Sequence, residues 1–393
     1  LHSTVQEHVF EARARHYDSA LHAALSSNEI ETDVYHTLVD EVGQALGSLH
    51  RQLSLRARAL RCDVLEYDDL YAPLEDELAS DYSWERTREI VLESVAPLGG
   101  PYVDQLRRAL TERWVDVDPR PGKRSGAYVN DGAYSAHPFM LLNHVDDFTS
   151  LSTVAHESGH LMHSLLSQKN CPYPTAHYVI FVGEVASTLN EQLLFHYMLQ
   201  RAEDEKRKLA LIDHHLERLR RTVFRQAMFA EFELAIHRTV ENGRALTADR
   251  LDESYLELLR RHHGTARQTM VIDEIYASEW ASVPHFFMNF YVYQYATSCV
   301  AAMLLAQRIL AGERGSLERY LNLLRSGSSE PPIELLCAAG VDMTSPEPIR
   351  AAVREMEDLM NRFSELLERR DESRTAQSSK SVGARPNASR TGA

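Results

Sequence analysis

Residues 153–163 read Thr-Val-Ala-His-Glu-Ser-Gly-His-Leu-Met-His and contain the pattern H-E-x-x-H. Apolar and small residues recur here at three- and four-residue intervals, which predicts a helix with one buried face formed by Leu151, Val154, Ala155, Ser158, Leu161, Met162 and Leu165. At about 100° per residue, His156, His160 and His163 fall together on roughly the opposite side of this helix.

This spacing of histidines is typical of a zinc site. Two imidazoles one helical turn apart can each place a nitrogen on one zinc ion at about 2.0–2.1 Å. Glu157 lies on the neighbouring flank, where it can reach a metal-activated water without being a ligand, as the general base of a metallopeptidase does. Because the chain has 19 histidines, a polar helix face with two solvated imidazoles is the alternative interpretation.

A catalytic zinc site needs a third protein ligand and an open position for water. Residues 181–191, Phe-Val-Gly-Glu-Val-Ala-Ser-Thr-Leu-Asn-Glu, place an acidic residue within an apolar run. A carboxylate in such a setting costs several kcal/mol unless it is paired or bound to a metal, so Glu184 is the predicted third ligand. Glu191, two turns later on the same face, either accepts a hydrogen bond from a ligand imidazole or forms a surface salt bridge.

Composition excludes several classes of function. A formal net charge of −15 argues against a nucleic-acid partner, which would require a basic patch. No segment has the ~18–20 uninterrupted apolar residues of a membrane span, and no signal peptide is visible. The four cysteines are far apart and form no C-x-x-C pair, which favours free thiols in a reducing cytoplasm. The oligomeric state is not indicated by the sequence.

The rest of the chain predicts a mainly α fold with one β-element. Helical periodicity dominates residues 1–122, whereas residues 127–129 and 138–143 are short apolar runs bounded by Gly and Pro that predict strands. This β-element, just before the zinc helix, either offers its edge to a peptide or forms a small hairpin that covers the core. Residues 369–393 contain almost no large apolar side chain and are predicted to be disordered.

A second notable segment is residues 284–298, Pro-His-Phe-Phe-Met-Asn-Phe-Tyr-Val-Tyr-Gln-Tyr-Ala-Thr-Ser. Taken alone, this pattern favours an aromatic helix that packs in the core.

Residues 156–163 and 181–191 together resemble the oligoendopeptidase F family, which comprises zinc metallopeptidases related to thimet oligopeptidase. The separation of His160 from Glu184 is close to that of the family, and residues 123–128 and 224–233 are also similar to family segments. His163 is not preceded by the glycine turn that introduces the third histidine of metzincins. It is therefore expected to line the site or to pack beside it, as a candidate substrate contact.

The resemblance implies a zincin-like helical metallopeptidase domain that holds one Zn²⁺ ion and cleaves short peptides. It also implies that residues 284–298 face the metal, with His285 and Tyr291 stabilising the oxyanion of the reaction. Tyr293 and Tyr295 would contact substrate, but a shift of one residue in the alignment would exchange the roles of the tyrosines.

Three portions are expected: an N-terminal helical portion (1–122), a catalytic portion (123–368) and the tail (369–393). The family carries a further helical section before the first portion, which this sequence lacks. The expected activity is that of a zinc-dependent oligoendopeptidase. The alternatives are a non-catalytic, zinc-containing peptide-binding relative or inactive fragment, and another zincin such as an aminopeptidase, which would trim peptides from one end.

Overall fold

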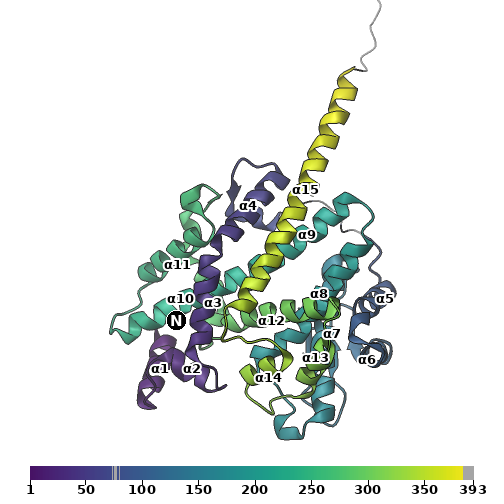
Figure 1. Cartoon of the computed structure of the whole chain (residues 1–393). Helices are drawn as coiled ribbons and strands as arrows, with labels where there is room; N and C mark the ends of the chain where they lie inside the picture. Colours follow the sequence, from purple (N-terminus) through teal and green to yellow (C-terminus); the bar gives the residue numbers. More distant parts are fainter. Residues whose placement is uncertain (73, 75–77, 79, 384–393) are drawn as a thin grey trace, which may run out of the picture.

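The computed structural model describes residues 1–72, 74, 78 and 80–383, and the side chains of these residues up to 372. Helices dominate it, as predicted (Figure 1). The α-helices are α1 (His2–Ala14), α2 (Ala20–Ser26), α3 (Thr32–Gln44), α4 (Leu46–Leu60), α5 (Trp84–Ser94), α6 (Gly100–Thr111), α7 (Phe148–Asn170), α8 (Ile180–Arg201), α9 (Glu205–Leu219), α10 (Arg225–Glu241), α11 (Ala248–His262), α12 (Tyr293–Leu310), α13 (Ser316–Arg325), α14 (Pro332–Ala339) and α15 (Glu347–Gly383).

Shorter helices connect these elements. One of them, η5 (Arg220–Phe224), is a π-helical turn that joins α9 directly to α10. The others are 3₁₀-helices, namely η1 (Tyr67–Tyr71), η3 (Ala96–Leu98), η4 (Tyr173–Thr175), η6 (Thr265–Arg267), η7 (Glu274–Ser282) and η8 (Pro284–Phe287).

The β-structure is small: of the five strands among the described residues, two lie where strands were predicted, at residues 128–130 and 139–141, and the other three were not predicted. Strand β4 (Phe139–Leu141) pairs in parallel with β2 (Val115–Asp116) and antiparallel with β3 (Tyr128–Asn130), so no described residue pairs with the other edge of β3. A second parallel pair, β1 (Leu65–Glu66) with β5 (Met270–Val271), was not predicted. Each of these two strands has only two residues, which is too short to produce a recognisable alternation of polar and apolar residues.

Helix α8 is the centre of the fold. It packs between α7 on one side and α12 on the other (Figure 1). Its side chains are buried nearly all round, including Phe181, Val185 and Leu189, each of which is 0% exposed. A helix that is apolar on almost every side belongs in the interior of a large protein, and α8 follows that rule.

Helices α7 and α8 approach each other closely at Gly159. The N-terminus of α7 is capped by Asp147, whose side chain accepts a hydrogen bond from the backbone N–H of Ser150. One face of α7, including Val154 and Leu161, is buried as predicted. A Cβ atom added to Gly159 would lie 2.4 Å from the carbonyl oxygen of Ala186 on α8. Only glycine therefore allows these two backbones to lie at their observed separation.

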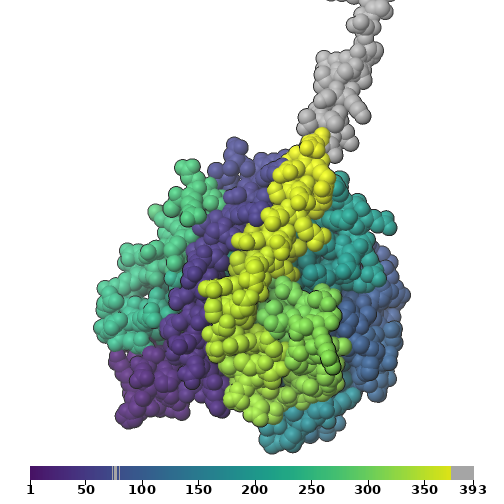
Figure 2. Space-filling view, in the orientation of Figure 1, coloured from purple at the N-terminus to yellow at the C-terminus, as the bar shows by residue number. Residues whose placement is uncertain are grey.

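The outer helices complete one continuous core. Buried residues from Val5 to Leu367 form a single hydrophobic cluster, so the predicted boundary at 122/123 is not a gap in the core and stays a prediction. Helix α15 packs against α3, α4, α9 and α12, and Figure 2 shows it lying across one face beside the N-terminal helices.

Helix α15 continues to Gly383, within the segment that was predicted to be disordered. The backbone there follows on from the packed part of the helix and meets no proline before residue 386. Residues 384–393 of that prediction lie outside the described residues. Among the described residues, no helix combines the length and the apolar character needed to cross a membrane.

The contact at Gly159 predicts a specific stability effect. Gly159→Ala should lower the free energy of unfolding by about 1–3 kcal/mol, because the added methyl group forces α7 and α8 apart. Gly47→Ala is the control, since its Cβ would meet nothing within 4 Å on α4 and should stabilise the helix by about 0.5–1 kcal/mol. Urea denaturation of both variants measures the difference. Equal effects of the two substitutions would contradict the close approach.

Candidate metal centre

Three potential metal ligands meet where α7 crosses α8. The ligand atoms of His156, His160 and Glu184 all lie within 4.8 Å of one another. Glu184 Oε2 is 3.4 Å from Nε2 of His156 and 3.4 Å from Nε2 of His160. Ligand atoms that lie 2.0–2.1 Å from a tetrahedral zinc ion are about 3.3–3.4 Å apart, so the spacing fits zinc.

The charge on Glu184 also suits a ligand. Burial acts to raise the pKa of its carboxyl group, but His160 and His156 outweigh burial and lower that pKa to about 2. The group is thus ionised near pH 7 and can bind a cation. Ser187 donates a hydrogen bond of 2.8 Å to Glu184 Oε2, which fixes the orientation of the carboxylate.

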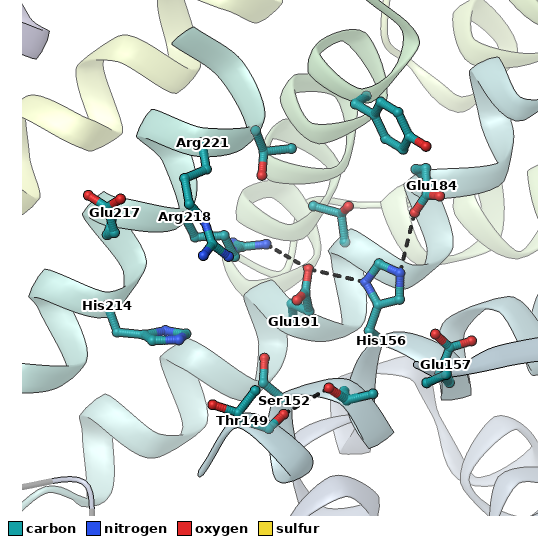
Figure 3. A pocket seen from close by; sticks show the side chains of 15 residues that line it. Thr149, Ser152, His156, Glu157, Glu184, Glu191, His214, Glu217, Arg218 and Arg221 are labelled. Atoms are coloured by element: carbon teal, nitrogen blue, oxygen red, sulfur yellow. Dashed lines mark hydrogen bonds and ion pairs between the residues drawn. The ribbon is translucent and has the colours of Figure 1, made fainter. Parts of the chain in front are cut away.

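The carboxylate of Glu191 lies beside Nδ1 of His156, the ring nitrogen that does not face Glu184. Its Oε2 atom is 3.5 Å from His156 Nδ1 and accepts a hydrogen bond of 2.9 Å from Nη1 of Arg218 on α9 (Figure 3). Burial opposes ionisation of Glu191, yet Arg218 and His156 together lower its pKa to about 2. A carboxylate beside Nδ1 favours a proton on that nitrogen and leaves Nε2 free for a metal. Of the two predicted contacts of Glu191, the structure contains the one with the imidazole of His156, and its ion pair, with Arg218, is largely shielded rather than at the surface.

Glu157 lies beside the cluster without belonging to it. Its side chain is buried, and its Oε2 atom has no hydrogen-bond partner among the described residues. Burial raises the pKa of this carboxyl group. An unpaired carboxylate oxygen at the edge of a cavity is free to exchange a proton with a bound water or ligand.

Two cavities adjoin the cluster. The first, which we call the α9-side cavity, has a volume of about 470 Å³ and is lined by His156, Glu157, Glu184, Arg218 and Arg221, among others. The second, the β3-side cavity, has a volume of about 510 Å³ and extends along Tyr128 and Val129 of β3. His156, Glu157 and Glu184 line both, so the cluster lies at their junction.

The segment from η8 to the start of α12 places His285, Tyr291 and Tyr295 together. The ring centroids of Tyr291 and Tyr295 are 5.6 Å apart, and that of His285 is 5.8 Å from Tyr291. Tyr295 also lines the α9-side cavity with Glu184. The segment is not one continuous helix, because α12 begins only at Tyr293.

Phe290 explains this break in the helix. Its backbone is left-handed, with φ of 49°, and its N–H donates a hydrogen bond of 2.7 Å to Oε1 of Glu233 on α10. Glu233 is fully buried, and burial raises the pKa of its carboxyl group well above the ordinary value. An unfavourable backbone conformation next to Tyr291 is thus held in place from the core.

Two predicted substrate contacts lie elsewhere. Tyr293 is 2% exposed and packs against Tyr35 and Phe181, so it is a core residue in this structure. His163 is fully buried, and its ring stacks on Tyr178 at 3.6 Å between centroids. Burial lowers the pKa of His163 to about 3, which keeps the imidazole neutral. It packs beside the site, which is one of the two positions expected for it.

Several residues at the site were not singled out by the sequence. Tyr178, Asp131 and His177 line the β3-side cavity, and Arg218 and Arg221 line the other. None of these residues belongs to a motif. The two arginines lie in a helical region whose alternating charges are typical of solvated helix faces. Only the packing of α9 against α8 reveals their position.

The contact between Glu191 and His156 predicts an effect on metal affinity. Glu191→Gln should weaken zinc binding by roughly 10–100-fold, because the orientation and basicity of the imidazole depend on that carboxylate. Zinc titration against a competing chelator measures the affinity. Glu253→Gln, an exposed change on α11, is the control. Unchanged zinc affinity in a folded Glu191→Gln protein would contradict the assignment.

Comparison with known proteins agrees with the resemblance seen in the sequence. The model of peptidase family M3 matches residues 1–355. The chain is 44% identical over 367 residues to oligopeptidase PepF of Bacillus subtilis, an alignment that covers 93% of this chain and 54% of that protein. It is 40% identical over 367 residues to group B oligopeptidase PepB of Streptococcus agalactiae, covering 93% and 60%.

Solved structures give the same result. A putative peptidase from Chlamydophila abortus superposes with a TM-score of 0.85 at 39% identity, covering 92% of this chain and 60% of that one. Oligoendopeptidase-F from Enterococcus faecium gives a TM-score of 0.74 at 33% identity, covering 93% and 58%. The chain thus spans little more than half the length of these relatives. The match across residues 1–355, together with these identities, shows that the chain belongs to peptidase family M3.

Proposed function

We propose that this chain carries the catalytic site of a zinc-dependent oligoendopeptidase, which hydrolyses internal bonds of short peptides. One observation carries the proposal: Glu157 lies beside the His156, His160 and Glu184 cluster with an unpaired carboxylate oxygen. The oligopeptidase names of relatives support the substrate class. The chain spans only part of the length of these relatives. The activity that we assign to it is therefore a proposal, as is any activity of the whole protein.

His156, His160 and Glu184 would hold the zinc ion. When bound, zinc supplies a Lewis acid that polarises the peptide carbonyl and makes water more acidic. Glu191 and Arg218 keep His156 in the orientation and tautomer that a ligand requires.

Glu157 would transfer the proton in the reaction. Its carboxylate takes a proton from the attacking water and then gives that proton to the departing amine. Burial raises the pKa of Glu157, which makes the carboxylate a stronger base than an exposed one.

Tyr295, Tyr291 and His285 would stabilise the negative charge that develops on the carbonyl oxygen. Donors of this kind act when they lie about 2.7–3.1 Å from the developing oxyanion. Burial raises the pKa of Tyr295 above the ordinary value of a phenol, so its hydroxyl keeps its proton near pH 7 and can donate a hydrogen bond. Its contact of 3.4 Å with the Tyr291 hydroxyl links the two phenols.

The peptide backbone would bind along β3. This strand lines the β3-side cavity, and one of its edges has no partner strand within the described ranges. An extended peptide can add to such an edge through main-chain hydrogen bonds, which places a peptide bond beside the cluster. Tyr128 is 37% exposed, which fits a strand that faces a cavity better than one that covers the core.

A relative that binds peptides without cutting them is the alternative. A purely structural zinc site would not need Glu157, whose buried Oε2 atom has no hydrogen-bond partner in the part of the chain that the structure describes, at a cost of about 1–3 kcal/mol. We place the activity in the cytoplasm, where exposed free thiols such as Cys337 stay reduced.

The role of Glu157 predicts a clear result. Glu157→Gln should lower the rate of cleavage of an internally quenched peptide of about eight residues by at least ~10²-fold, since the general base is lost. Zinc content should stay at one ion per chain, as measured by mass spectrometry of the folded protein. Glu253→Gln again serves as the control. Full activity of Glu157→Gln would exclude this mechanism, and zinc without cleavage by the native chain would favour the peptide-binding alternative.

The contact between Glu233 and Phe290 predicts an effect at a distance. Glu233→Ala should lower kcat on the order of 10-fold, because loss of the Phe290 anchor displaces Tyr291 from the reacting oxygen. Glu233→Gln keeps an acceptor oxygen and should be nearly neutral. In a Tyr291→Phe background, Glu233→Ala should have little further effect on kcat. A full additional loss in that background would contradict action through Tyr291.

A further inference from the structure

The α9-side cavity has a second end, away from the metal cluster. Figure 3 shows His156, Glu157 and Glu184 at one side of this cavity and His214, Glu217 and Arg221 at the other. Of these six residues, the reaction proposed above uses only His156, Glu157 and Glu184. The second side is built by the C-terminal half of α9 and by η5.

Most charges at this second end are already paired. Glu217 accepts two hydrogen bonds of 2.9 Å from Nε of Arg220, and Arg218 is paired with Glu191 at 2.9 Å. His214 is neutral near pH 7, because burial and the charge of Arg218 lower its pKa to about 4.

Arg221 is different. Its side chain is exposed and lines the cavity, and it forms no ion pair or side-chain hydrogen bond with any residue that the structure describes. In Figure 3 it extends beside Arg218. It also lies in the π-helical turn η5, and such turns occur frequently at functional sites. The chain carries a formal net charge of −15, so a cavity wall with an unpaired arginine is a local exception to the overall charge.

We propose that Arg221 binds a carboxylate of the peptide substrate, in the first place its C-terminal carboxylate. This inference rests on the proposed function and adds a specificity determinant to it. A guanidinium group matches a carboxylate with two parallel N–H···O bonds, which makes arginine the side chain best suited to this ligand.

The C-terminal carboxylate is the favoured source because every unmodified peptide carries it, whatever its sequence. Its distance from the bond cleaved is limited by the span of one cavity of about 470 Å³. An anchor of this kind therefore selects short peptides cut a few residues from their C-terminus. An acidic side chain at the same place offers the same chemistry, and the experiment separates the two sources.

The test compares three internally quenched peptides of one sequence. The first ends in a free carboxylate, the second in an amide, and the third in an amide with Asp as the last residue. Cleavage is measured as kcat/KM with the zinc-loaded native chain, with Arg221→Ala, and with Arg107→Ala, which removes an exposed arginine of α6 that lines neither cavity. Fluorescence anisotropy with the Glu157→Gln protein measures binding of the same peptides without cleavage.

The native chain should prefer the free carboxylate over the amide on the order of 10-fold in both assays, as expected for a charge-assisted bidentate contact. Arg221→Ala, alone or added to Glu157→Gln, should reduce this ratio to about one, whereas Arg107→Ala should keep it. Recovery of the preference by the Asp peptide would show that a side-chain carboxylate is also accepted. If the Asp peptide does not restore the preference, the contact is assigned to the C-terminal carboxylate alone.

Equal cleavage and equal binding of acid and amide by the native chain would overturn the inference and leave the proposed function intact. So would a ratio that survives in Arg221→Ala. Failure of the native chain to cut any peptide, while the ratio persists in binding, would remove the proposed catalysis but keep the Arg221 contact. Failure both to cut and to bind would overturn the two together.

Discussion

The close approach of α7 and α8 at Gly159 is the constraint on which the candidate site depends. The histidines lie on α7, and Glu184 and Glu191 lie on α8. If the two backbones were further apart, the carboxylate of Glu184 would not be 3.4 Å from both imidazoles. The same contact also joins the two central helices of the core, so the stability of the fold and the geometry of the ligands depend on one glycine.

A second constraint is that three glutamates, Glu157, Glu184 and Glu191, are largely shielded from solvent around the histidine cluster. Each would be costly in an apolar interior if it stood alone. Glu184 faces two imidazoles, and Glu191 faces an imidazole and a guanidinium group, so both have partners. Glu157 has none among the described residues, and its pKa is raised rather than lowered. The carboxylates of Glu184 and Glu191 are thus arranged to pair with cationic groups, whereas the carboxyl group of Glu157 can exchange a proton.

The sequence predicted the parts of this site that depend on helical periodicity. The buried face of α7, the H-E-x-x-H pattern and an acidic residue in an apolar run are all local features, and the structure brings these residues together. The sequence could not predict the directions of Tyr293 and Tyr295, because the left-handed backbone of Phe290 interrupts the helical periodicity. That backbone conformation depends on a hydrogen bond to Glu233, which lies 57 positions earlier in the chain. Arg221 carries no local signal either, since its meaning comes from the packing of α9 against α8.

The free edge of β3 has a further consequence, which concerns folded proteins. A strand of three residues can pair only with a segment whose own backbone groups are unpaired and extended. Strands inside a native sheet have already used those groups, and helices have used them internally. The proposed main-chain pairing at this edge would therefore distinguish unstructured segments from structured ones without any moving gate, and three residues are too few to nucleate the sheet growth that longer exposed edges invite.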